Sequence, residues 1–400
     1  MLQNKKILIG ITGSIAAYKI IGLVRMLTKQ GAEVKVIMTP SATKFVSPLV
    51  LETLSKNVVL QNLSSASTWA NHVELGRWAD VFLIAPLSAN TLAKMANGIC
   101  ENLLLAVYFS ATCPVAVAPA MDEDMWKHPS TKRNLKLLEQ DGVAVMPVGY
   151  GELASGLVGE GRLAEPENII NFLVAHFFRG HLLQHKKVLV TAGPTYEPID
   201  PVRFVGNHSS GKMGFAIAEA CFLQGADVVL VAGPSSEKLN YDEIKRINIT
   251  TANEMLEQCK TEAPTADIII MNAAVADFTP VQQATQKIKK EKSESEWQLT
   301  LVKTTDILAL LGHSKLPHQY VMGFALETEN ELKNSLEKLN AKKIDSIVLN
   351  SLNNAHAGFG FDTNQVTIIS KNGNQEVVPL KSKTEVAKEI VVFISKEINA

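Results

Sequence analysis

The stretch KKILIGITGS (residues 5–14) decides the fold, because the chain repeats its pattern as KKVLVTAGPT (residues 186–195). Both are short apolar runs that end in a turn containing Thr and Gly. In each half a helix-like stretch, a second strand and a third strand follow. These strands are GAEVKVIM (from Gly31) and ADVFLIAP (from Ala79), then GADVVLVAG (from Gly225) and ADIIIMNA (from Ala266). The succession is typical of parallel α/β units, in which ligands bind where the strands end, so two candidate sites are expected.

The two openings divide the chain into two expected domains. A length of 400 residues suits two or three domains, and a hydrophobic content of 46% is ample for buried cores. The first domain is expected over residues 1–178. A basic, histidine-bearing joint, FFRGHLLQHKK (residues 177–187), leads into the second, which is expected over residues 186–400. We predict two Rossmann-like parallel-sheet domains of the α/β class.

The charge balance argues against several kinds of partner. The formal net charge of −1 at pH 7 gives no electrostatic footprint for nucleic acid or an anionic membrane. Small molecules and further copies of the chain are therefore the expected partners. The cysteines show no CxxC or metal-ligand spacing, which favours a reducing compartment without a disulfide framework or zinc site. They are Cys100, Cys113, Cys221 and Cys259.

The N-terminus superficially resembles a signal peptide, because two lysines precede ILIGITGSIAA. That apolar run is short, is broken by Gly, Thr and Ser, and leads directly into a helix-like segment, so we interpret it as the first strand. No apolar stretch approaches the roughly 18 to 20 residues that a membrane span requires. We therefore expect a cytoplasmic protein with no membrane partner.

The second half carries a turn-rich insertion and a distinctive end. The segment AGPTYEPIDPVRFVGNHSSG (residues 192–211) separates the first strand of this half from its helix, and its prolines predict no regular structure there. The stretch QKIKKEKSESEW (residues 286–297) is expected to be a mobile loop. Near the end, DSIVLN predicts a strand, VTIISKNGNQEVVPL a hairpin turning at Asn372 and Gly373, and the last fifteen residues a helix.

Three polar loops that follow the first three strands form the candidate site of the first half. The first turn, GITGSIAAYK, lacks the G-x-G-x-x-G fingerprint, but Gly13 and Ser14 are expected at a helix start, whose free N–H groups favour a phosphate. The other loops, TPSATKF (residues 39–45) and PLSANTLAKMANG (residues 86–98), are rich in hydroxyl and amide groups. Such groups could bind phosphate, ribityl hydroxyls or a flat ring. The alternative is a tight turn at Gly13 and ordinary helix caps elsewhere.

Six motifs in order carry a resemblance to a known family: GSIAAYK, TPSA, NHVELGRWAD, PLSANTLAKMANG, PAMDEDMW and SGLVGEGR. With them the first half resembles the flavin-dependent cysteine decarboxylases, and the second half resembles the phosphopantothenate–cysteine ligases. The whole chain therefore resembles the bifunctional coenzyme A biosynthesis proteins of bacteria, which join the two activities. The resemblance implies a flavodoxin-like, flavin-binding decarboxylase domain over residues 1–178 and a nucleotide-binding ligase domain over residues 186–400.

The resemblance implies an FMN site in the first half. FMN would oxidise the substrate thiol, and the resulting thioaldehyde loses CO₂ easily, so the protein positions the cofactor and moves protons. His72 falls on the family's essential histidine, a residue type that exchanges protons near neutral pH. Without the surrounding motif, His72 would be interpreted as a capping or surface histidine. The implied FMN contacts are Gly13, Ser14, Thr39, Ser41, Ser88, Asn90, Thr91 and Met121.

Two positions depart from the family pattern. The family's PxMNxxMW clamp, whose Asn contacts the substrate carboxylate, reads PAMDEDMW here and places Asp122 at that position. An ionised Asp would repel a carboxylate at hydrogen-bond range, so Asp122 must be protonated, turned away or offset by a nearby cation. The family's flap cysteine, which protonates the enethiol, aligns with Ser155. A hydroxyl is a far weaker acid than a thiol, so the reductive step depends on whether Ser155 relays a proton through water.

The segment GNHSSGKM (residues 206–213) nearly spells a phosphate-binding P-loop, G-x-x-x-x-G-K-[ST]. Met213 replaces the hydroxyl that would hold Mg²⁺, and the motif lies well beyond the strand end, so a true P-loop is not expected. Small residues at a helix start still form an anion nest, and Lys212 adds positive charge.

The ligase resemblance implies a nucleotide site in the second half. Asn207 falls on an asparagine tied to turnover of the acyl-cytidylate intermediate, and Lys287 matches the family's essential lysine. Attack of a carboxylate on a triphosphate builds negative charge that a mobile ammonium can neutralise. The alternative for Lys287 is a solvated run of charge. The implied CTP contacts are Ser210, Gly211, Lys212, Asp277, Lys287, Thr304, Thr305, Asp306, Ile307, Phe324, Lys338 and Lys342.

The resulting hypothesis is a two-domain enzyme. Its ligase half activates 4′-phosphopantothenate with CTP and joins it to L-cysteine, and its flavin half decarboxylates the product towards 4′-phosphopantetheine. Mg²⁺ is expected with the triphosphate, although no carboxylate cluster identifies its ligands. The resemblance also implies a homo-oligomer. Two alternatives stay open: a working ligase whose flavin half stops at the oxidised enethiol, and a flavin-binding regulatory subunit.

Overall fold

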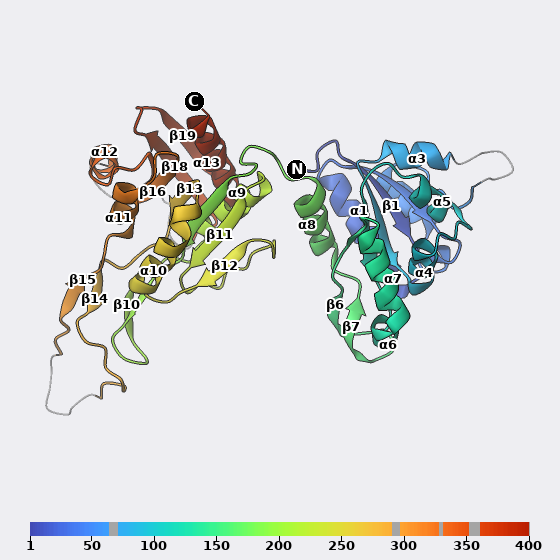
Figure 1. Cartoon of the computed structure of the whole chain (residues 1–400), viewed down its shortest axis with the longest axis horizontal. Coiled ribbons are helices and arrows are strands. Elements are labelled where there is room, and N and C mark those ends of the chain that lie inside the picture. The colour runs from blue at the N-terminus through green and yellow to red at the C-terminus, as the bar shows by residue number, and fades with distance from the viewer. Residues whose placement is uncertain (64–70, 290–296, 328–330, 352–360, 400) are drawn as a thin grey trace. The chain divides into compact units, whose positions relative to one another are not determined.

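The computed structural model describes residues 1–63, 71–289, 297–327, 331–351 and 361–399 (Figure 1). It divides the chain into two compact units, Met1–Phe178 and Arg179–Ala400. Within the described ranges, no helix has the length and apolar character that crossing a bilayer requires. Most of the segment expected to be a mobile loop, residues 286–297, lies outside the described residues.

The first unit is built on a five-stranded parallel sheet in the order β2-β1-β3-β4-β5. The strands are β1 Lys6–Ile11, β2 Glu33–Met38, β3 Val81–Leu87, β4 Val115–Pro119 and β5 Ala144–Val145. Strands β3 and β4 are buried along their whole length, as expected for a parallel sheet covered on both faces. The order reverses between β1 and β3, and sheets of this kind bind ligands at that switch point.

Helices cover both faces of this sheet, because right-handed crossovers on the two sides of a switch point lie on opposite faces. One buried cluster joins α3, α4, α5 and α7 to the strands, with Leu75, Leu92 and Leu135 beside Phe82. Helix α1 packs against α2 and α8. The helices are α1 Lys19–Lys29, α2 Pro48–Ser55, α3 His72–Trp78, α4 Ala89–Ala96, α5 Leu103–Ser110, α6 Glu123–Lys127, α7 Pro129–Gln140 and α8 Pro166–Phe177.

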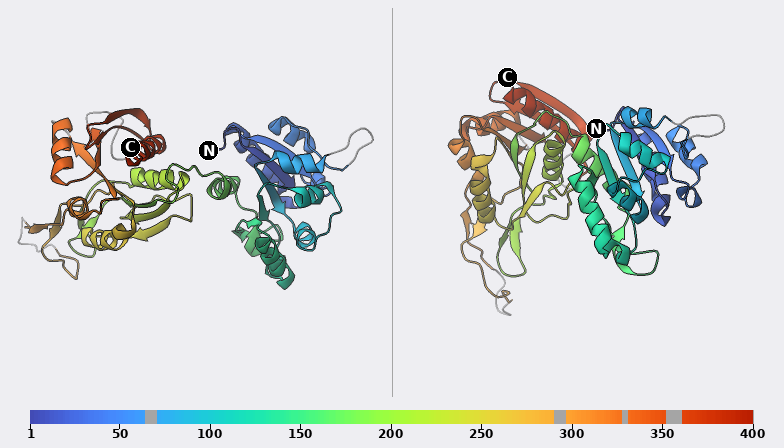
Figure 2. Two further views of the ribbon diagram at one scale, coloured as in Figure 1. Left: turned by 45° about the horizontal axis from the view of Figure 1, so that its top comes forward. Right: turned by 45° about the vertical axis from the view of Figure 1, so that its right-hand side comes forward.

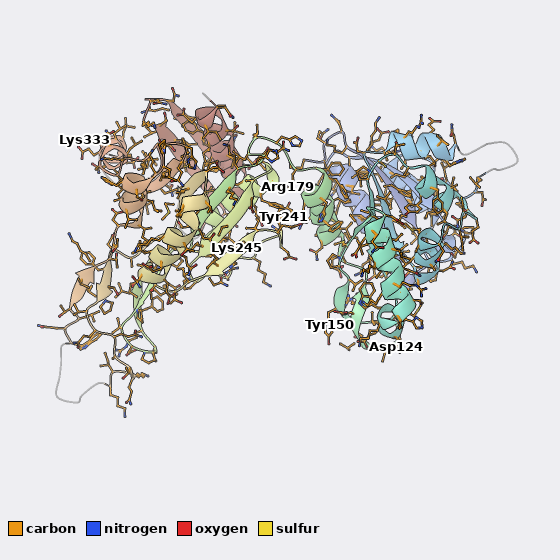
Figure 3. All side chains as sticks on the ribbon, viewed as in Figure 1. Asp124, Tyr150, Arg179, Tyr241, Lys245 and Lys333 are labelled. Atoms are coloured by element: carbon orange, nitrogen blue, oxygen red, sulfur yellow. The ribbon has the colours of Figure 1, made fainter. Side chains whose placement is uncertain are left out.

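A two-stranded antiparallel hairpin, β6 (Gly149–Glu152) with β7 (Val158–Arg162), follows α7 and stands apart from the main sheet. It packs against α6, where the Trp126 Nε1–H donates to Glu160 Oε2 at 2.9 Å. Figure 3 shows Asp124 of α6 and Tyr150 of β6 at the same end of the unit.

The second unit has an eight-stranded sheet in the order β12-β11-β8-β13-β16-β17-β18-β19. Strands β12 to β17 of this order are parallel, and β18 and β19 are antiparallel additions. The switch in strand order lies between β8 and β13. The strands are β8 Lys187–Ala192, β11 Asp227–Ala232, β12 Lys245–Asn248, β13 Ile268–Met271, β16 Tyr320–Glu327, β17 Ser346–Ser351, β18 Thr363–Ser370 and β19 Gln375–Ser382.

Helices lie on both sides of the second sheet (Figure 2). A buried cluster contains Met255 of α10, Leu311 of α11, Leu339 of α12 and Leu189 of β8. Helix α9 packs against β8 and against α13. The helices are α9 Lys212–Leu223, α10 Ala252–Glu262, α11 Ile307–Ser314, α12 Glu331–Ala341 and α13 Lys383–Ile398.

The second unit begins with residues that close the C-terminal end of α9. Arg179 donates from Nε to the Phe222 carbonyl at 2.7 Å and from Nη2 to the Ala226 carbonyl at 2.6 Å. The Gly180 N–H donates to the Leu223 carbonyl at 2.7 Å. A helix leaves its last carbonyls without intrahelical partners and favours a cation there, so the bonds to Phe222 and Leu223 complete α9. The bond to Ala226 fixes the turn before β11.

Two short ribbons also belong to the second unit: β9 (Tyr196–Pro198) with β10 (Phe204–Gly206), and β14 (Phe278–Pro280) with β15 (Leu301–Lys303). The prediction that the prolines of residues 192–211 prevent regular structure is therefore wrong. Pro198 ends a strand of a two-stranded ribbon, where every strand has a free edge and a missing N–H is tolerated.

The predictions of the fold class and of the C-terminal elements are confirmed. Both openings are first strands of parallel α/β units, and the chain is of the α/β class. The stretch DSIVLN contributes β17, and the predicted hairpin is formed by β18 and β19. That hairpin turns at Gly373, whose φ of +85° is a left-handed conformation that glycine adopts without strain.

Candidate functional site

Hydrogen bonds join the loops at the carboxyl ends of β1, β2 and β3, at the switch point of the first sheet. Thr12 Oγ1 donates to the Pro86 carbonyl at 2.6 Å and accepts from the Ser88 N–H at 2.9 Å. Thr39 Oγ1 donates to the Ile11 carbonyl at 3.4 Å. The loops that follow these strands are therefore held together as one polar surface.

Gly13 lies against Ser41 in this surface. A Cβ at Gly13 would be 2.7 Å from Ser41 Oγ, so a larger residue requires the loop to move. Ser14 caps the short 3-10 helix Ile15–Tyr18 and accepts from the Ala16 N–H at 3.3 Å. Small residues and a hydroxyl at a helix start form the kind of surface that admits a phosphate.

The loop after β3 contains a true helix cap. Ser88 Oγ accepts from the Thr91 N–H at 3.4 Å at the start of α4. Thr91 is buried, whereas Asn90 is exposed on the first turn. Ser41, in contrast, forms no cap bond. The cap interpretation thus accounts for Ser88 and Ser14 and leaves the hydroxyl of Ser41 without that explanation.

A cavity of about 490 Å³ lies between the start of α1, the loop after β4 and the β6–β7 hairpin. Among the predicted site residues, Ser14, Met121 and Asp122 line it. The residues that line it are Ser14, Ile15, Ala16, Tyr18, Lys19, Ala120, Met121, Asp122, Glu152, Leu153, Ala154, Gly161, Arg162 and Leu163. The adjoining hydroxyl loops suit a phosphate-bearing ligand, and the apolar residues suit a flat ring, so the residues present fit FMN.

Ser155 and His72 lie outside this cavity lining. Ser155 is exposed in the hairpin turn, where its Oγ accepts from the Leu157 N–H at 3.4 Å. The carbonyl of His72 accepts from Ser110 Oγ at 3.4 Å. Ser110 ends α5, from which the chain enters the amino end of β4. His72 is therefore on the amino-end side of the sheet, while the cavity is at the carboxyl ends.

The second unit has a cavity of about 440 Å³ at its own switch point. The structure brings together there the predicted catalytic residue Asn207 and most of the residues that the resemblance implies for CTP: Asp277, Thr304, Thr305, Asp306, Ile307, Phe324, Lys338 and Lys342. Asn207 is held by its amide, which donates to the Ala274 carbonyl at 3.0 Å and the Val275 carbonyl at 3.2 Å. Thr304 donates from Oγ1 to the Ala276 carbonyl at 2.6 Å.

The wall of this cavity carries two ammonium groups. Lys342 pairs with Asp306 at 2.7 Å, and Lys338 Nζ is 3.5 Å from the Phe324 carbonyl. Burial is the largest single effect on the Asp306 carboxyl and would raise its pKa. The hydrogen bonds from Lys342 and the Ala309 N–H and the charges of the two lysines together lower the pKa. Lys342 lies one residue beyond α12, yet its N–H still bonds the Lys338 carbonyl at 3.0 Å. Both side chains line one cavity, which suits a polyanion.

Ser210, Gly211 and Lys212 line a small adjoining cavity of about 70 Å³. Gly211, with φ +85°, precedes the first residue of α9. Lys212 pairs with Asp362 at 2.6 Å, and this hydrogen bond raises the pKa of Lys212. Burial, followed by the nearby charge of Lys212, lowers the pKa of Lys383 in the same wall. The P-loop-like segment is therefore a cationic helix start beside the larger cavity.

Lys287 lies outside the described lining of both cavities. It is exposed, and the neighbouring Ile288 ties its loop to the β9–β10 turn: the Ile288 N–H donates to Asp200 Oδ2 at 3.1 Å, and Arg203 Nη2 donates to the Ile288 carbonyl at 3.1 Å. The hydrogen bond from Arg203 and bonds from backbone N–H groups hold the pKa of Asp200 well below its usual range, although burial opposes the shift.

Some cavity residues were missed by sequence reasoning. Asn272 and Asn350 line both cavities of the second unit, at the carboxyl ends of β13 and β17. The rule that ligands bind at strand ends could have found both. Lys19 and Arg162 in the first cavity have no such signal, because one is in a helix and the other in a hairpin. Among the described residues, no group of three or more His, Cys, Asp or Glu could hold a metal ion.

Comparison with known proteins agrees with this division. Residues 1–178 match the family model "Flavoprotein", and residues 183–398 match "DNA/pantothenate metabolism flavoprotein C-terminal domain". The coenzyme A biosynthesis bifunctional protein of Bacillus subtilis (strain 168) is 43% identical over 403 residues, covering 99% of this chain and 98% of the relative.

The chain belongs to the family of coenzyme A biosynthesis bifunctional proteins. A second relative, from an unknown prokaryotic organism, is named cysteine/cysteine sulfinic acid decarboxylase and is 47% identical over 352 residues, or 86% of this chain and 98% of the relative. A solved structure of the FMN-binding protein AtHal3 is 36% identical and covers 43% of this chain and 95% of its own, with a TM-score of 0.38.

Proposed function

We propose that the unit Met1–Phe178 binds FMN and decarboxylates 4′-phosphopantothenoylcysteine, and that the unit Arg179–Ala400 makes this compound from 4′-phosphopantothenate, L-cysteine and CTP. The observation that carries the proposal is the second cavity, which gathers the implied nucleotide contacts on a chain of this family. A regulatory subunit that only binds flavin has no need of such a cavity.

In the first unit, bound FMN would supply a reversible two-electron acceptor: electrons leave the substrate thiol before CO₂ is lost and return afterwards, so that the net reaction is decarboxylation. The N–H groups at Gly13 and Ser14 suit its phosphate, and the hydroxyls of Thr39, Ser41, Ser88 and Thr91 and the amide of Asn90 suit its ribityl chain. Met121 borders the cavity as a contact for the ring. The hairpin shields the site from water on one side.

In the second unit, the carboxylate of 4′-phosphopantothenate attacks CTP, pyrophosphate leaves, and the cysteine amine then displaces CMP. Lys338 and Lys342 on the cavity wall stabilise the phosphate charge, with Lys287 supplied by its loop. Asn207 is placed by its bonds to the loop after β13. Mg²⁺ would accompany the triphosphate, bound in part by the phosphates themselves.

We also propose that the protein is a homo-oligomer. The ribbons and the residues beside them expose apolar side chains, which are Val202, Phe204, Phe278, Val281, Leu301 and Val302. Large apolar side chains exposed on neighbouring ribbons favour an interaction site. We further propose that His72, which lies on the amino-end side of the first sheet, serves the flavin cavity of a second copy.

A second candidate function is direct decarboxylation of free cysteine by the flavin unit. It is favoured by the relative named cysteine/cysteine sulfinic acid decarboxylase and by the replacement of the expected Asn and Cys with Asp122 and Ser155. The two candidates differ in whether the ligase must act first.

One reaction tests these proposals: purified protein with FMN, 4′-phosphopantothenate, L-cysteine, CTP and Mg²⁺, with products identified by mass spectrometry. We expect 4′-phosphopantetheine, or a product two hydrogens lighter if the route through Ser155 fails. In the second case Ser155→Cys should shift the product to 4′-phosphopantetheine. Accumulation of 4′-phosphopantothenoylcysteine would contradict the decarboxylase. Loss of CO₂ from cysteine without CTP would favour the second candidate.

The FMN assignment predicts that Gly13→Ala weakens flavin binding at least tenfold, because the new Cβ would lie 2.7 Å from Ser41 Oγ. The measurement is flavin absorbance retained after reconstitution and gel filtration. Gly22→Ala is the matched control. Gly22 lies within α1, and a Cβ there would meet nothing closer than the Pro166 side chain at 3.8 Å. Equal flavin retention in both variants would contradict the phosphate site at Gly13.

A further inference from the structure

We propose that Arg162 binds the carboxylate of the flavin unit's substrate, the role for which the family uses the asparagine that Asp122 replaces. The proposal rests on the proposed function of that unit. The positive charge of Arg162 would offset the repulsion between Asp122 and an anionic substrate. The proposal follows from the contact between the β6–β7 hairpin and the loop after β4.

The backbone brings Arg162 next to Asp122. The Met121 N–H donates to the Gly161 carbonyl at 3.0 Å. A Cβ at Gly161 would lie 2.2 Å from the Met121 carbonyl oxygen, so only glycine permits this approach. The next residue on each side, Asp122 and Arg162, lines the cavity. A hairpin residue and a clamp residue therefore face one space.

Asp122 offers no donor to a substrate carboxylate. It precedes α6, and its side chain forms no cap bond with that helix. Among the described residues its carboxylate forms no hydrogen bond or ion pair, although its backbone carbonyl accepts from the Trp126 N–H at 2.9 Å. The carboxylate therefore lines the cavity without a direct partner. A second carboxylate at hydrogen-bond range would be repelled unless a cation lies between them.

Two cationic side chains line this cavity, and they differ in how many of their N–H donors already have partners. The Lys19 side chain is 9% exposed, and its ammonium donates to the Leu163 carbonyl at 3.0 Å and to Glu165 at 2.7 Å. Arg162 is 38% exposed and meets Glu165 at 3.7 Å. A guanidinium has five N–H donors, so most donors of Arg162 stay available after this contact.

The hairpin also makes room for the guanidinium. A Cβ at Gly151 would lie 2.8 Å from Nη1 of Arg162, so the guanidinium extends across a glycine of the facing strand. A planar fork there can bind the substrate carboxylate through two parallel N–H donors, and its positive charge offsets the negative charge of Asp122 in the same cavity wall.

The carboxylate that Arg162 binds is the group that leaves as CO₂. The affinity for a ligand without a carboxylate should therefore not depend on Arg162. This gives a test with two unreactive ligands, 4′-phosphopantothenoylserine and 4′-phosphopantothenoylethanolamine, which differ only in the carboxylate. Binding to the full flavin-loaded chain is followed by the change in flavin absorbance, which reports the flavin site and not the ligase site.

Arg162→Ala should weaken binding of the serine ligand about 10- to 100-fold, the size expected for lost hydrogen bonds to a charged group, and leave the ethanolamine ligand within about twofold. Arg162→Lys should lie between. Arg133→Ala, an exposed arginine of α7 outside the cavity lining, is the matched control. Equal losses for both ligands, or no loss, would overturn the proposal. If the unchanged protein binds neither ligand, the proposed function falls as well.

Asp122→Asn gives a second, independent readout, because it restores an amide donor. In that background, Arg162→Ala should cost less affinity for the serine ligand than it does beside Asp122. If Arg162→Ala lowers the affinity for the serine ligand by the same factor in both backgrounds, the two residues act independently and the coupling between them is overturned. Retained flavin absorbance and an unchanged thermal midpoint in each variant exclude misfolding as the cause.

Discussion

Lys287→Ala is expected to lower the rate of CTP-dependent pyrophosphate release by about 100-fold or more, roughly 2.7 kcal/mol of transition-state stabilisation. The reason is electrostatic: attack on the triphosphate develops negative charge, and an ammonium delivered by a loop neutralises it. The assay measures pyrophosphate released from CTP with 4′-phosphopantothenate and Mg²⁺. Because the structure leaves Lys287 exposed and outside the cavity lining, the effect should appear in kcat more than in KM.

Lys289→Ala is the matched control, since this lysine is also exposed two residues along the same loop. It should leave the rate within about threefold. If both variants lose activity alike, the loop acts as a general patch of positive charge. An unchanged rate for Lys287→Ala would remove the lysine from the mechanism and restore the interpretation of a solvated run of charge.

Asp345→Ala is expected to destabilise the second unit by about 3 kcal/mol, because it breaks a buried ionic cluster. The Asp345 side chain is 5% exposed, pairs with Lys315 and Lys371 at 2.5 Å each, and accepts from the Val321 N–H at 2.8 Å. Removing the carboxylate leaves these donors unsatisfied. Urea denaturation followed by circular dichroism measures the change, with exposed Asp242→Ala as a control expected within 0.5 kcal/mol.

The effect of Asp345→Ala should depend on pH. Burial would raise the pKa of Asp345, but hydrogen bonds from Lys315 and Lys371 and from the backbone outweigh it, so the pKa is lowered. A carboxyl with a lowered folded-state pKa stabilises the fold above its unfolded value, about 3.9, and loses this contribution as the pH falls. The difference between wild type and variant should be full at pH 7 and shrink below about pH 4. A difference that grew on acidification would contradict this.

The sequence predicts the parallel units well because their strands are short apolar runs whose ends coincide with turn residues. The same rule predicts the polar surface around Gly13 and Ser41, since successive parallel strands end at one edge of a sheet. The ribbon at Pro198 was not predicted, because a proline excludes a central strand but not the free edge of a two-stranded one.

The candidate sites are predictable only in part. Loops directly after strands, such as those with Asp277 and Thr304, can be placed from sequence, and the structure puts both in one cavity. Arg162 reaches its cavity through a hairpin that folds back after α7, a long-range contact that no local pattern encodes. The position of His72 likewise depends on how α3 packs against α5, which the motif around it does not specify.

The hydrogen bonds from Arg179 and Gly180 to the end of α9 determine where the two activities can be separated genetically. A ligase fragment that begins at Lys186, where the second strand pattern begins, would discard the groups that satisfy two carbonyls at that helix end and one in the turn that follows it. The other end of the same helix carries Gly211 and Lys212, so fraying of α9 would also loosen the glycine-rich loop that lines the small cavity. A split that separates the two activities therefore needs to begin the ligase at or before Arg179. The residues from Arg179 to Lys186, which connect the two units in the sequence, belong structurally to the ligase unit.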